Sequence, residues 1–591
     1  MKVFCCNKSF WLLFVICVIT LLPMLGLSEY HTKGEPREAI VSYSMIVGDD
    51  WVSPRNNGGE LAYKPPFFHW CVAAVSLING AVTEASSRMP SALALIIMTL
   101  AGYCFYAKRK SQKVAFVSAL VAFTSFELHR AGANCRVDMV LTALIVLSLY
   151  RLYVWSESRM SGVPWLAILF MSLATLTKGP VGSVLPCLVT GVYLLLRGNG
   201  FLKVFFRLFV FGLLSLCLYG VWFYAAWQRG GQEFLDLMYE ENIGRMTGTM
   251  TYSSHEEPWV YNILTIIAGY IPWTLLVVIA LFQVPYSRLK GRVYAAWNAS
   301  CKGNGMPERI SSCWFWLKSK VAAVADVDLF SFLSFAVIFV FYCIPESKRS
   351  VYLMPVYPFI GYFVARLLLW LQANRPSVLK AYIGFISLLA ILLSVVFVIV
   401  RMRLIPESIF GSGRHSDVNI AMLHALENIS SPVQLVLAAV PFIVGLLWWL
   451  FGKRRSVGHR LLTSVFVTVF ALYVALDSVY IPTVLNCKSV KAVSAEIDRV
   501  FPASKGVLYE YIDMGVKAKG NPMHFFEINF YLHNRIENFY LRKPSRGFLL
   551  ISSADAEMCF PDYERQGYRF WLRYDLKKRD IKLYEFINEN D

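Results

Sequence analysis

The sequence EYHTKGEPREAIVSYSMIVGDDWVSPRNNGGELAYKPPFFHWCVAAVSLINGAVTEASSR occupies residues 29–88 and separates the first long apolar segment from the second. It is charged, and glycines and prolines interrupt it. Its own apolar run, residues 67–78, is too short to cross a hydrocarbon core about 30 Å thick, which takes roughly 20 residues. We therefore expect a helix in the membrane interface that holds a charged loop against the membrane surface. Such a loop suits a site that must meet the head group of a lipid.

Apolar side chains dominate the chain as a whole. Of its 591 residues 57% are hydrophobic and 16% are charged, with a mean hydropathy of +0.50. A soluble chain is nearer half apolar and about a quarter charged, so this composition indicates a polytopic membrane protein. The net charge of +18 does not indicate nucleic-acid binding, because no basic stretch is interleaved with stacking aromatics in a soluble domain, and Lys and Arg collect in the cytoplasmic loops of membrane proteins.

About thirteen apolar runs are candidates for membrane spans. They lie near 10–27, 89–107, 114–131, 138–155, 163–177, 180–196, 206–227, 261–283, 329–345, 352–371, 381–400, 434–451 and 461–482. The first run resembles a signal peptide but lacks a convincing cleavage site, so we expect an uncleaved span with a cytoplasmic N-terminus. Every second loop is rich in Lys and Arg, and the positive-inside rule then places the loop 28–88 and the C-terminus outside.

The C-terminal part, residues 484–591, has a different pattern from the predicted membrane domain, residues 1–483. Helical and strand-like periods alternate along it, which predicts a small α/β domain on the periplasmic side. The segments are helical at 490–500 and 524–533 and strand-like at 506–511, 548–551 and 581–586. Cys487 and Cys559 lie in this domain and could pair in an oxidising compartment. The cysteines show no metal spacing.

The loop 28–88 carries a series of short motifs in a fixed order. They are E-P-R-E-A, G-D-D-W-V-S-P-R, N-G-G, Y-K-P-P-F-F-H-W and S-R-M-P-S-A-L. This order resembles the first external loop of the bacterial aminoarabinose transferases and of their relatives, the dolichyl-phosphate-mannose protein mannosyltransferases. The resemblance extends loosely over most of the chain. It implies a GT-C fold and a glycosyltransferase of the bacterial inner membrane that takes a sugar from undecaprenyl phosphate to a periplasmic acceptor such as lipid A or an envelope glycan.

The resemblance also implies two catalytic carboxylates. The matching family motif is typically Asp-Glu-x-Arg-Tyr, and its leading Asp is a proposed catalytic group. Here Gly34 stands at that position, so either Glu35 takes over the role or the base lies elsewhere. Asp138 matches the second carboxylate, in the next external loop, and Arg37 and Arg136 would orient the pair. The alternative is that these residues form local ion pairs at a loop and a helix end.

Cations are expected around the lipid phosphate. Lys64 should lie at the N-terminal end of the interfacial helix, where the helix dipole favours a phosphate, and the resemblance gives it that contact. Arg245, Lys348 and Tyr352 lie in segments similar to external family loops that supply cations and a Tyr to the phosphate. Lys178 is expected to line the cavity or the lipid entrance.

These residue types fit the chemistry that the resemblance implies. A phosphate leaves, so cations must stabilise its growing charge, and a carboxylate base would assist the acceptor by roughly 10²–10⁴-fold. The family Glu that helps bind a metal in some members is replaced by Tyr63, so no metal site is carried over, although a divalent metal remains possible. The alternatives are a protein O-mannosyltransferase, a lipid or solute transporter, and a non-enzymatic envelope scaffold.

Overall fold

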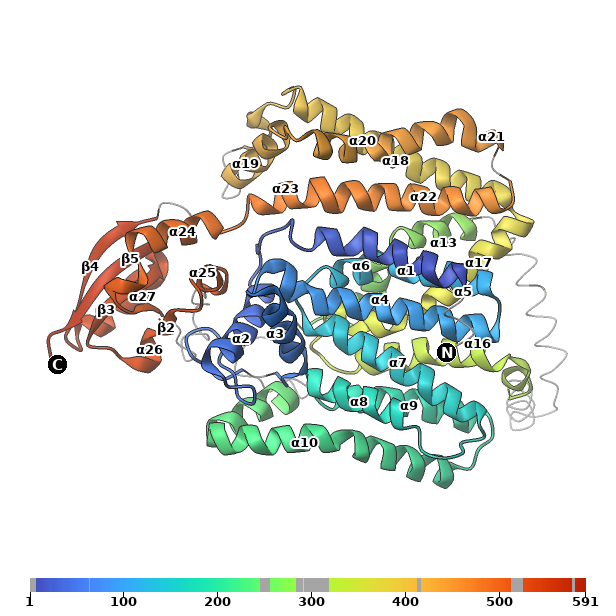
Figure 1. Ribbon diagram of the computed structural model, residues 1–591, viewed down its shortest axis with the longest axis horizontal. Coiled ribbons are helices and arrows are strands. Elements are labelled where there is room, and N and C mark those ends of the chain that lie inside the picture. Colours follow the sequence, from blue (N-terminus) through green and yellow to red (C-terminus); the bar gives the residue numbers. More distant parts are fainter. Residues whose placement is uncertain are drawn as a thin grey trace.

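The computed structural model describes residues 7–62, 64–244, 256–282, 291, 318–411, 416–455, 457–511, 525–576 and 580–590. Most of these residues form a helical bundle, and a domain built on a β-sheet lies at one end of it (Figure 1). Within the described ranges, eight helices are long and apolar enough to cross a membrane, or up to ten if each of two bent pairs is one span. The chain is a multi-pass membrane protein.

The eight helical segments vary from 18 to 39 residues. They are α4 (Glu84–Arg109), α7 (Val137–Glu157), α10 (Phe201–Tyr239), α16 (Asp326–Cys343), η3 with α17 (Ser350–Asn374), α18 (Pro376–Arg401), α20 with η5 (Pro432–Gly452) and the run from α22 through α23 (His459–Asn486). The bent pairs are α5 (Gln112–Phe123) with α6 (Phe126–Gly132), and α12 (Val260–Gly269) with α13 (Trp273–Leu281).

Each of the thirteen predicted ranges falls on an apolar helix or helix pair, but three of these helices are short. They are α1 (Lys8–Leu21, continued by η1 to Met24), α8 (Trp165–Lys178) and α9 (Val181–Leu196). Hydropathy reports an apolar run and not the length of the helix it forms, because a polar or glycine-containing turn ends the helix early. This difference in length explains why the number of full spans is smaller than the number of apolar runs.

The two bent pairs meet at their bends. The pairs bend by 69° and 105°, at Thr124–Ser125 and at Tyr270–Pro272. The backbone N–H of Phe126 donates to the carbonyl of Ile271 at 2.9 Å, and the indole N–H of Trp273 donates to Thr124 Oγ1 at 3.1 Å. The first of these contacts pairs a backbone donor at one break with a backbone acceptor at the other, as is required of irregular backbone inside a membrane.

The loop predicted to be functional forms two helices beside the bundle, α2 (Gly34–Gly48) and α3 (Phe67–Asn79) (Figure 1). Helix α3 buries Phe68, His69, Val72 and other residues at helical spacing against its neighbours. Its C-terminal end leaves Ile78 89% exposed. A short helix with one buried stripe and an exposed apolar end is consistent with the expected position at a membrane surface.

The C-terminal domain contains a five-stranded sheet in the order β2-β1-β3-β5-β4. The strands are β1 (Leu508–Glu510), β2 (Ile536–Asn538), β3 (Arg546–Ser552), β4 (Tyr568–Asp575) and β5 (Ile581–Asn588), with helices α24 (Lys491–Val500), α25 (Phe526–Tyr531), α26 (Phe539–Arg542) and α27 (Ser553–Glu564). Strand β1 is parallel to β2 and β3, whereas β5 is antiparallel to β3 and β4. Both Cys487 and Cys559 are free thiols here.

Specific contacts fix this domain to the loop at 28–88. Gly58 pairs with Glu537 of β2 in a parallel bridge, and Asn57 hydrogen-bonds to the buried carboxylate of Glu510. The hydroxyl of Tyr531 donates to Glu84 at 2.9 Å and accepts from the backbone N–H of Tyr30 at 3.0 Å. The loop is therefore held between the bundle and the sheet domain.

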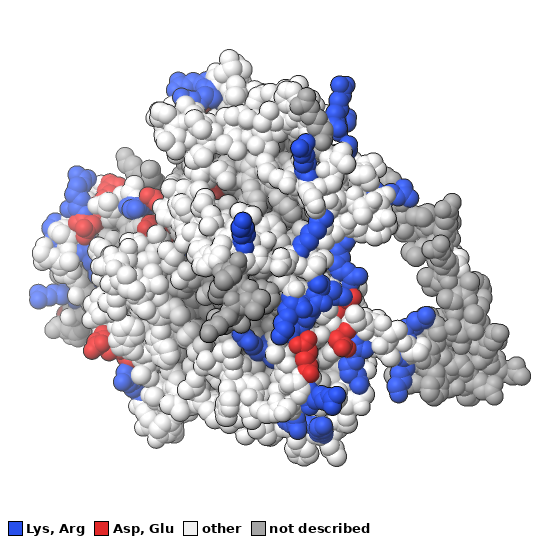
Figure 2. Space-filling view, turned by 45° about the vertical axis from the view of Figure 1, so that its right-hand side comes forward, with Lys and Arg blue, Asp and Glu red and all other residues white. Residues whose placement is uncertain are grey.

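Charge is distributed unevenly over the surface. Lys and Arg gather towards the end of the bundle opposite to the sheet domain, and broad uncharged surface lies between the two ends (Figure 2). Several of these cations bridge neighbouring helices through acids: Lys110 and Arg366 both pair with Asp328, at 2.9 and 2.8 Å, and Arg197 pairs with Asp326 at 2.8 Å. An apolar belt between charged ends is the surface expected of a protein that spans a membrane.

Candidate active site

Opposite charges meet where α2, α7 and α8 come together with the loop before α3. The ammonium of Lys64 pairs with Glu38, and that of Lys178 pairs with Asp138. The negative charge of Asp138 also raises the pKa of Lys64, so the two ion pairs adjoin. Three of the predicted residues are thereby brought together, with Glu38 as a fourth member that sequence reasoning did not assign to the site.

Glu38 lies under its partners and is only 3% exposed. Its Oε1 accepts from Arg37 Nη2 at 3.1 Å and from Lys64, and its Oε2 lies 3.0 Å from Nε2 of His69. Burial alone would raise the pKa of Glu38, but Lys64, the His69 hydrogen bond and Arg37 together hold it well below its ordinary value. Glu38 is therefore ionised, and Arg37 orients this carboxylate and not Glu35.

Lys64 is the most strongly perturbed cation of the site. Burial lowers its pKa to about 8, and the attraction of Glu38 offsets only part of that effect. It lies just before α3, as predicted from the Tyr63-Lys64-Pro65-Pro66 motif. A partly desolvated ammonium interacts strongly with any anion that enters, because little water screens the pair.

Lys178 and Tyr352 also come together, although 174 positions separate them in the sequence. The ammonium of Lys178 lies 4.3 Å from the centre of the Tyr352 ring, a cation–π arrangement. Tyr342 stacks on the same ring with centroids 5.6 Å apart. Lys178 is thus held between an aromatic face and the carboxylate of Asp138.

The remaining predicted cations are placed differently. Lys348 is buried and its ammonium donates to the carbonyls of Pro345 and Glu346, at 2.7 and 3.3 Å. It therefore stabilises the turn that precedes η3. Arg245 lies outside the described residues. The expected convergence of Lys64, Arg245 and Lys348 on one phosphate stays a prediction.

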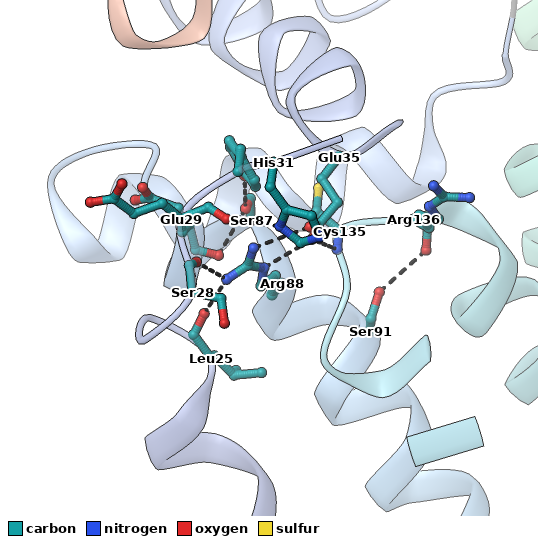
Figure 3. Close-up of polar contacts among 12 residues, drawn as sticks. Leu25, Ser28, Glu29, His31, Glu35, Ser87, Arg88, Ser91, Cys135 and Arg136 are labelled. Carbon is teal, nitrogen blue, oxygen red and sulfur yellow. Dashed lines mark hydrogen bonds and ion pairs between the residues drawn. The ribbon is translucent and has the colours of Figure 1, made fainter. Parts of the chain in front are cut away.

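Glu35, predicted as a catalytic carboxylate, is engaged in a buried ion pair (Figure 3). Its Oε1 accepts from Arg88 Nε at 2.9 Å and from the backbone N–H of Cys135 at 2.8 Å, and its Oε2 accepts from Arg88 Nη2 at 3.1 Å. Arg88 Nη1 donates to the carbonyls of Leu25 and Ser28 at 2.7 and 2.6 Å. Burial would raise the pKa of Glu35, but Arg88 holds it below its ordinary value. This geometry favours an anchoring role that ties α2 to α4.

Gly34 and Arg136 form a packed pair. A Cβ at position 34 would collide with Nη2 of Arg136 and lie 3.0 Å from its Cζ. Gly34 does not have the positive φ that would require glycine, so the reason for this residue is space and not backbone conformation. The positive charge of Arg136 acts on Asp138, and its Nε has no hydrogen-bond partner among the described residues.

The groups at the centre of the site form one charged cluster. Of the described residues, it holds four cationic side chains and two carboxylates, namely Arg37, Lys64, Arg136 and Lys178 with Glu38 and Asp138. Within the described ranges, no group of three or more His, Cys, Asp or Glu is arranged to hold a metal ion. Both carboxylates are matched to Lys partners, so these residues do not fit a metal centre and favour binding of an anion.

Two hollows lie near the cluster. A cavity of about 500 Å³ is lined by Glu35, Arg88 and the cluster residue Arg136, together with His31, His129 and Asp477. An apolar groove of about 460 Å³ runs between α9 and α10 and begins at Pro180, two residues after Lys178. The cluster is thus next to a mixed polar cavity and to a groove suited to a hydrocarbon chain.

Comparison with known proteins identifies several relatives by sequence. The family of dolichyl-phosphate-mannose-protein mannosyltransferases matches residues 63–224. The chain is 26% identical over 271 residues to the undecaprenyl phosphate-alpha-4-amino-4-deoxy-L-arabinose arabinosyl transferase of Pseudomonas aeruginosa, which covers 44% of this chain and 47% of that protein. An uncharacterized protein of Aquifex aeolicus is 27% identical over 361 residues, covering 61% and 63%. The matches span about half to two thirds of these curated relatives.

The fold is similar over a greater length. The crystal structure of ArnT from Cupriavidus metallidurans bound to undecaprenyl phosphate superposes with a TM-score of 0.65 and 18% identity, covering 98% of each chain. The apo structure of ArnT gives the same TM-score at 16% identity, covering 97% of each chain. The chain therefore has the fold of the solved ArnT structures, and its sequence is similar to aminoarabinose transferases and, over residues 63–224, to the protein mannosyltransferases.

Proposed function

We propose that this chain is an integral-membrane glycosyltransferase. It moves a sugar from undecaprenyl phosphate to a periplasmic acceptor such as lipid A or another envelope glycan. One observation carries the proposal: the charged cluster has an excess of positive charge over carboxylate at the end of an apolar groove. The names of the curated relatives, and the lipid bound to the solved ArnT, support the same donor class.

The charge of the cluster suits the reaction. The donor carries one negative charge on its phosphodiester, whereas the released undecaprenyl phosphate is a phosphomonoester that carries close to two at neutral pH. The cluster has two more cations than carboxylates. Its charge therefore complements the leaving group better than the intact donor, which is the requirement for lowering the barrier to transfer.

Individual residues take distinct parts in this proposal. Lys64 and Lys178 bind the phosphate oxygens, and Tyr352 keeps Lys178 in place through its ring. Asp138 holds Lys178 and faces the sugar, Arg37 and Arg136 support the carboxylates, and Arg245 and Lys348 complete the phosphate site from their loops. The polyprenyl chain lies in the groove between α9 and α10, whose lining is almost wholly apolar.

The orientation follows from charge. The end of the bundle with most of the Lys and Arg is cytoplasmic under the positive-inside rule (Figure 2). The site and the sheet domain then face the periplasm, across a bacterial inner membrane. Residues 1–483 form the membrane domain, and residues 484–591 form the periplasmic domain that covers the loop at 28–88.

A protein acceptor is the second candidate, favoured by the match of residues 63–224 to the protein mannosyltransferases. A transporter is less well supported, since Glu38 and Lys64 lie outside the spans and Asp138 lies in the first turn of α7. Transport pathways place ionisable residues in the middle of spans.

A turnover assay tests the proposal. Purified protein is incubated with undecaprenyl-phosphate sugars and with lipid A, glycan or peptide acceptors, and release of undecaprenyl phosphate is followed by mass spectrometry. Turnover by wild type and by Lys113→Ala, a matched control at the opposite end of the bundle, with loss in Lys64→Ala, is expected. Equal turnover in all three proteins would contradict the assigned site. The acceptor that supports turnover, a lipid or glycan on the one hand or a peptide on the other, distinguishes the two candidate functions.

A further inference from the structure

Three carboxylates lie around the charged cluster, and their surroundings differ. Both oxygens of Glu35 are occupied by Arg88, and one also by the backbone N–H of Cys135. Asp138 pairs with Lys178, the cation held on the ring of Tyr352. Glu38 alone combines contacts to cations with a histidine. Protonation of Glu35 would neutralise one side of this buried bidentate pair and leave the charge of Arg88 uncompensated.

The partners of Glu38 are the groups that a phosphate would attract. Side chains of Arg37 and Lys64 are 28% and 17% exposed, whereas that of Glu38 is 4% exposed. The two cations are therefore more accessible than Glu38 to an anion that enters from solvent. When they turn to a phosphate, Oε1 of Glu38 loses its partners, while Oε2 keeps the hydrogen bond from His69.

Helix geometry relates Glu38 to Gly34. Residues four apart on a helix lie on the same face with Cβ atoms about 5–6 Å apart, so the two positions project toward the same region. At position 34 the space for a side chain is filled by the guanidinium of Arg136. A carboxylate cannot occupy that space while Arg136 lies there, but one turn further along the helix Glu38 reaches Lys64.

We propose that Glu38 is the catalytic base of this chain and that Gly34 makes room for the arrangement by accommodating Arg136. The proposal rests on the proposed function and names the group that carries out its proton transfer. Glu38 takes the proton of the acceptor hydroxyl as the hydroxyl oxygen attacks the anomeric carbon. The bond from that carbon to the phosphate oxygen breaks, and its electron pair stays on undecaprenyl phosphate.

His69 is a positioning residue in this scheme. It is 1% exposed on α3, and its Nε2 hydrogen fixes Oε2 of Glu38 at 3.0 Å. Because Oε2 is held, the direction of Oε1 is fixed as well. The same contact fixes α2 against α3, so the base and Lys64 stay in register.

The test compares Glu38→Gln, Glu38→Asp and Glu35→Gln in the turnover assay with a hydroxyl-bearing acceptor. If Glu38 is the base, Glu38→Gln lowers kcat by about 10²-fold or more with donor KM nearly unchanged. Glu38→Asp retains part of the rate and the acid limb of the pH profile. The folded fraction of Glu35→Gln has the same kcat as wild type.

The decisive variant is the exchange Gly34→Asp/Glu38→Gln. This exchange returns a carboxylate to the same helix face. The guanidinium of Arg136 lies at the end of a flexible side chain, so it can move and pair with the new carboxylate. Recovery of kcat by at least tenfold over Glu38→Gln supports the proposal. A raised donor KM with kcat preserved in Glu38→Gln overturns it, because Glu38 would then only hold Lys64.

Failure of the proposed function has a different signature. In that case wild type would release no undecaprenyl phosphate from any donor. Wild-type turnover that is equally fast in Glu38→Gln would instead overturn only the assignment of the base. Elution from size-exclusion chromatography and melting temperature identify any variant that has failed to fold, and Glu38→Asp keeps the test valid if Glu38→Gln is one of them.

Discussion

Replacing Arg88 by Met should destabilise the protein strongly and in a pH-dependent way. The substitution keeps the length of the side chain but removes both hydrogen bonds to Glu35 and those to the carbonyls of Leu25 and Ser28. Breaking a buried ion pair from one side costs about 3–5 kcal/mol, since the other charge is left uncompensated.

Protonation of Glu35 limits this cost. The ordinary pKa of the group is 4.5, so taking up a proton at pH 7 costs about 3.4 kcal/mol and at pH 5 about 0.7 kcal/mol, at 1.36 kcal/mol per unit. The carbonyls left without a donor add about 1–3 kcal/mol at either pH. In wild type Arg88 holds the pKa of Glu35 below its ordinary value, so the stability it contributes is present above pH 4.5 and is lost only as pH falls through that lower value.

The assay is equilibrium unfolding in mixed detergent micelles at pH 7 and pH 5. We expect Arg88→Met to lower the free energy of unfolding by about 4–6 kcal/mol at pH 7 and by about 2.7 kcal/mol less at pH 5. Arg565→Met is the control: the side chains of Arg565 and its partner Asp562 are 79% and 71% exposed, so their pair should contribute less than about 1 kcal/mol. Equal losses in the two variants, or a loss independent of pH, would refute the reasoning.

Three other perturbations have defined outcomes. Lys178→Met should lower kcat/KM by about 10²-fold, as loss of one donor to a developing charge does, measured by release of undecaprenyl phosphate. Tyr352→Phe should keep activity because the ring that holds Lys178 remains, whereas Tyr352→Leu should reduce it; loss in Tyr352→Phe would instead assign the contact to the hydroxyl. Burial raises the pKa of Glu510 to about 8, so the melting temperature of wild type should fall as pH rises from 5 to 8, and Glu510→Gln should remove that slope.

Hydropathy predicted the helical architecture well. The apolar runs mark the helices of the bundle because transfer of a helix into lipid depends chiefly on its hydrophobicity. In the sheet domain, β1, β3 and β5 coincide with the predicted strand segments. Strands β2 and β4 were missed, since β2 has three residues and β4 lies at the edge of the sheet with most of its side chains exposed or half-buried.

The site was predictable in its residue types but not in its pairings. The sequence pointed to Lys64, Asp138, Lys178 and Tyr352, yet it carried no signal that Lys178 lies on the ring of Tyr352. Pairing across distant helices depends on how they pack, and local patterns do not encode it. The spacing of Gly34 and Glu38, one helical turn, was the available signal for Glu38. That signal could be interpreted only from the structure, in which Arg88 binds both oxygens of Glu35.

The most direct test of the central claim is binding of undecaprenyl phosphate to the charged cluster. The dissociation constant is measured in detergent for wild type, for Lys64→Ala/Lys178→Ala and for Lys113→Ala. We expect the double variant to bind at least about 100-fold more weakly, with Lys113→Ala unchanged, because two charge-assisted contacts to the phosphate are lost. Equal affinity in all three proteins would show that the cluster does not hold the lipid phosphate and would contradict the account.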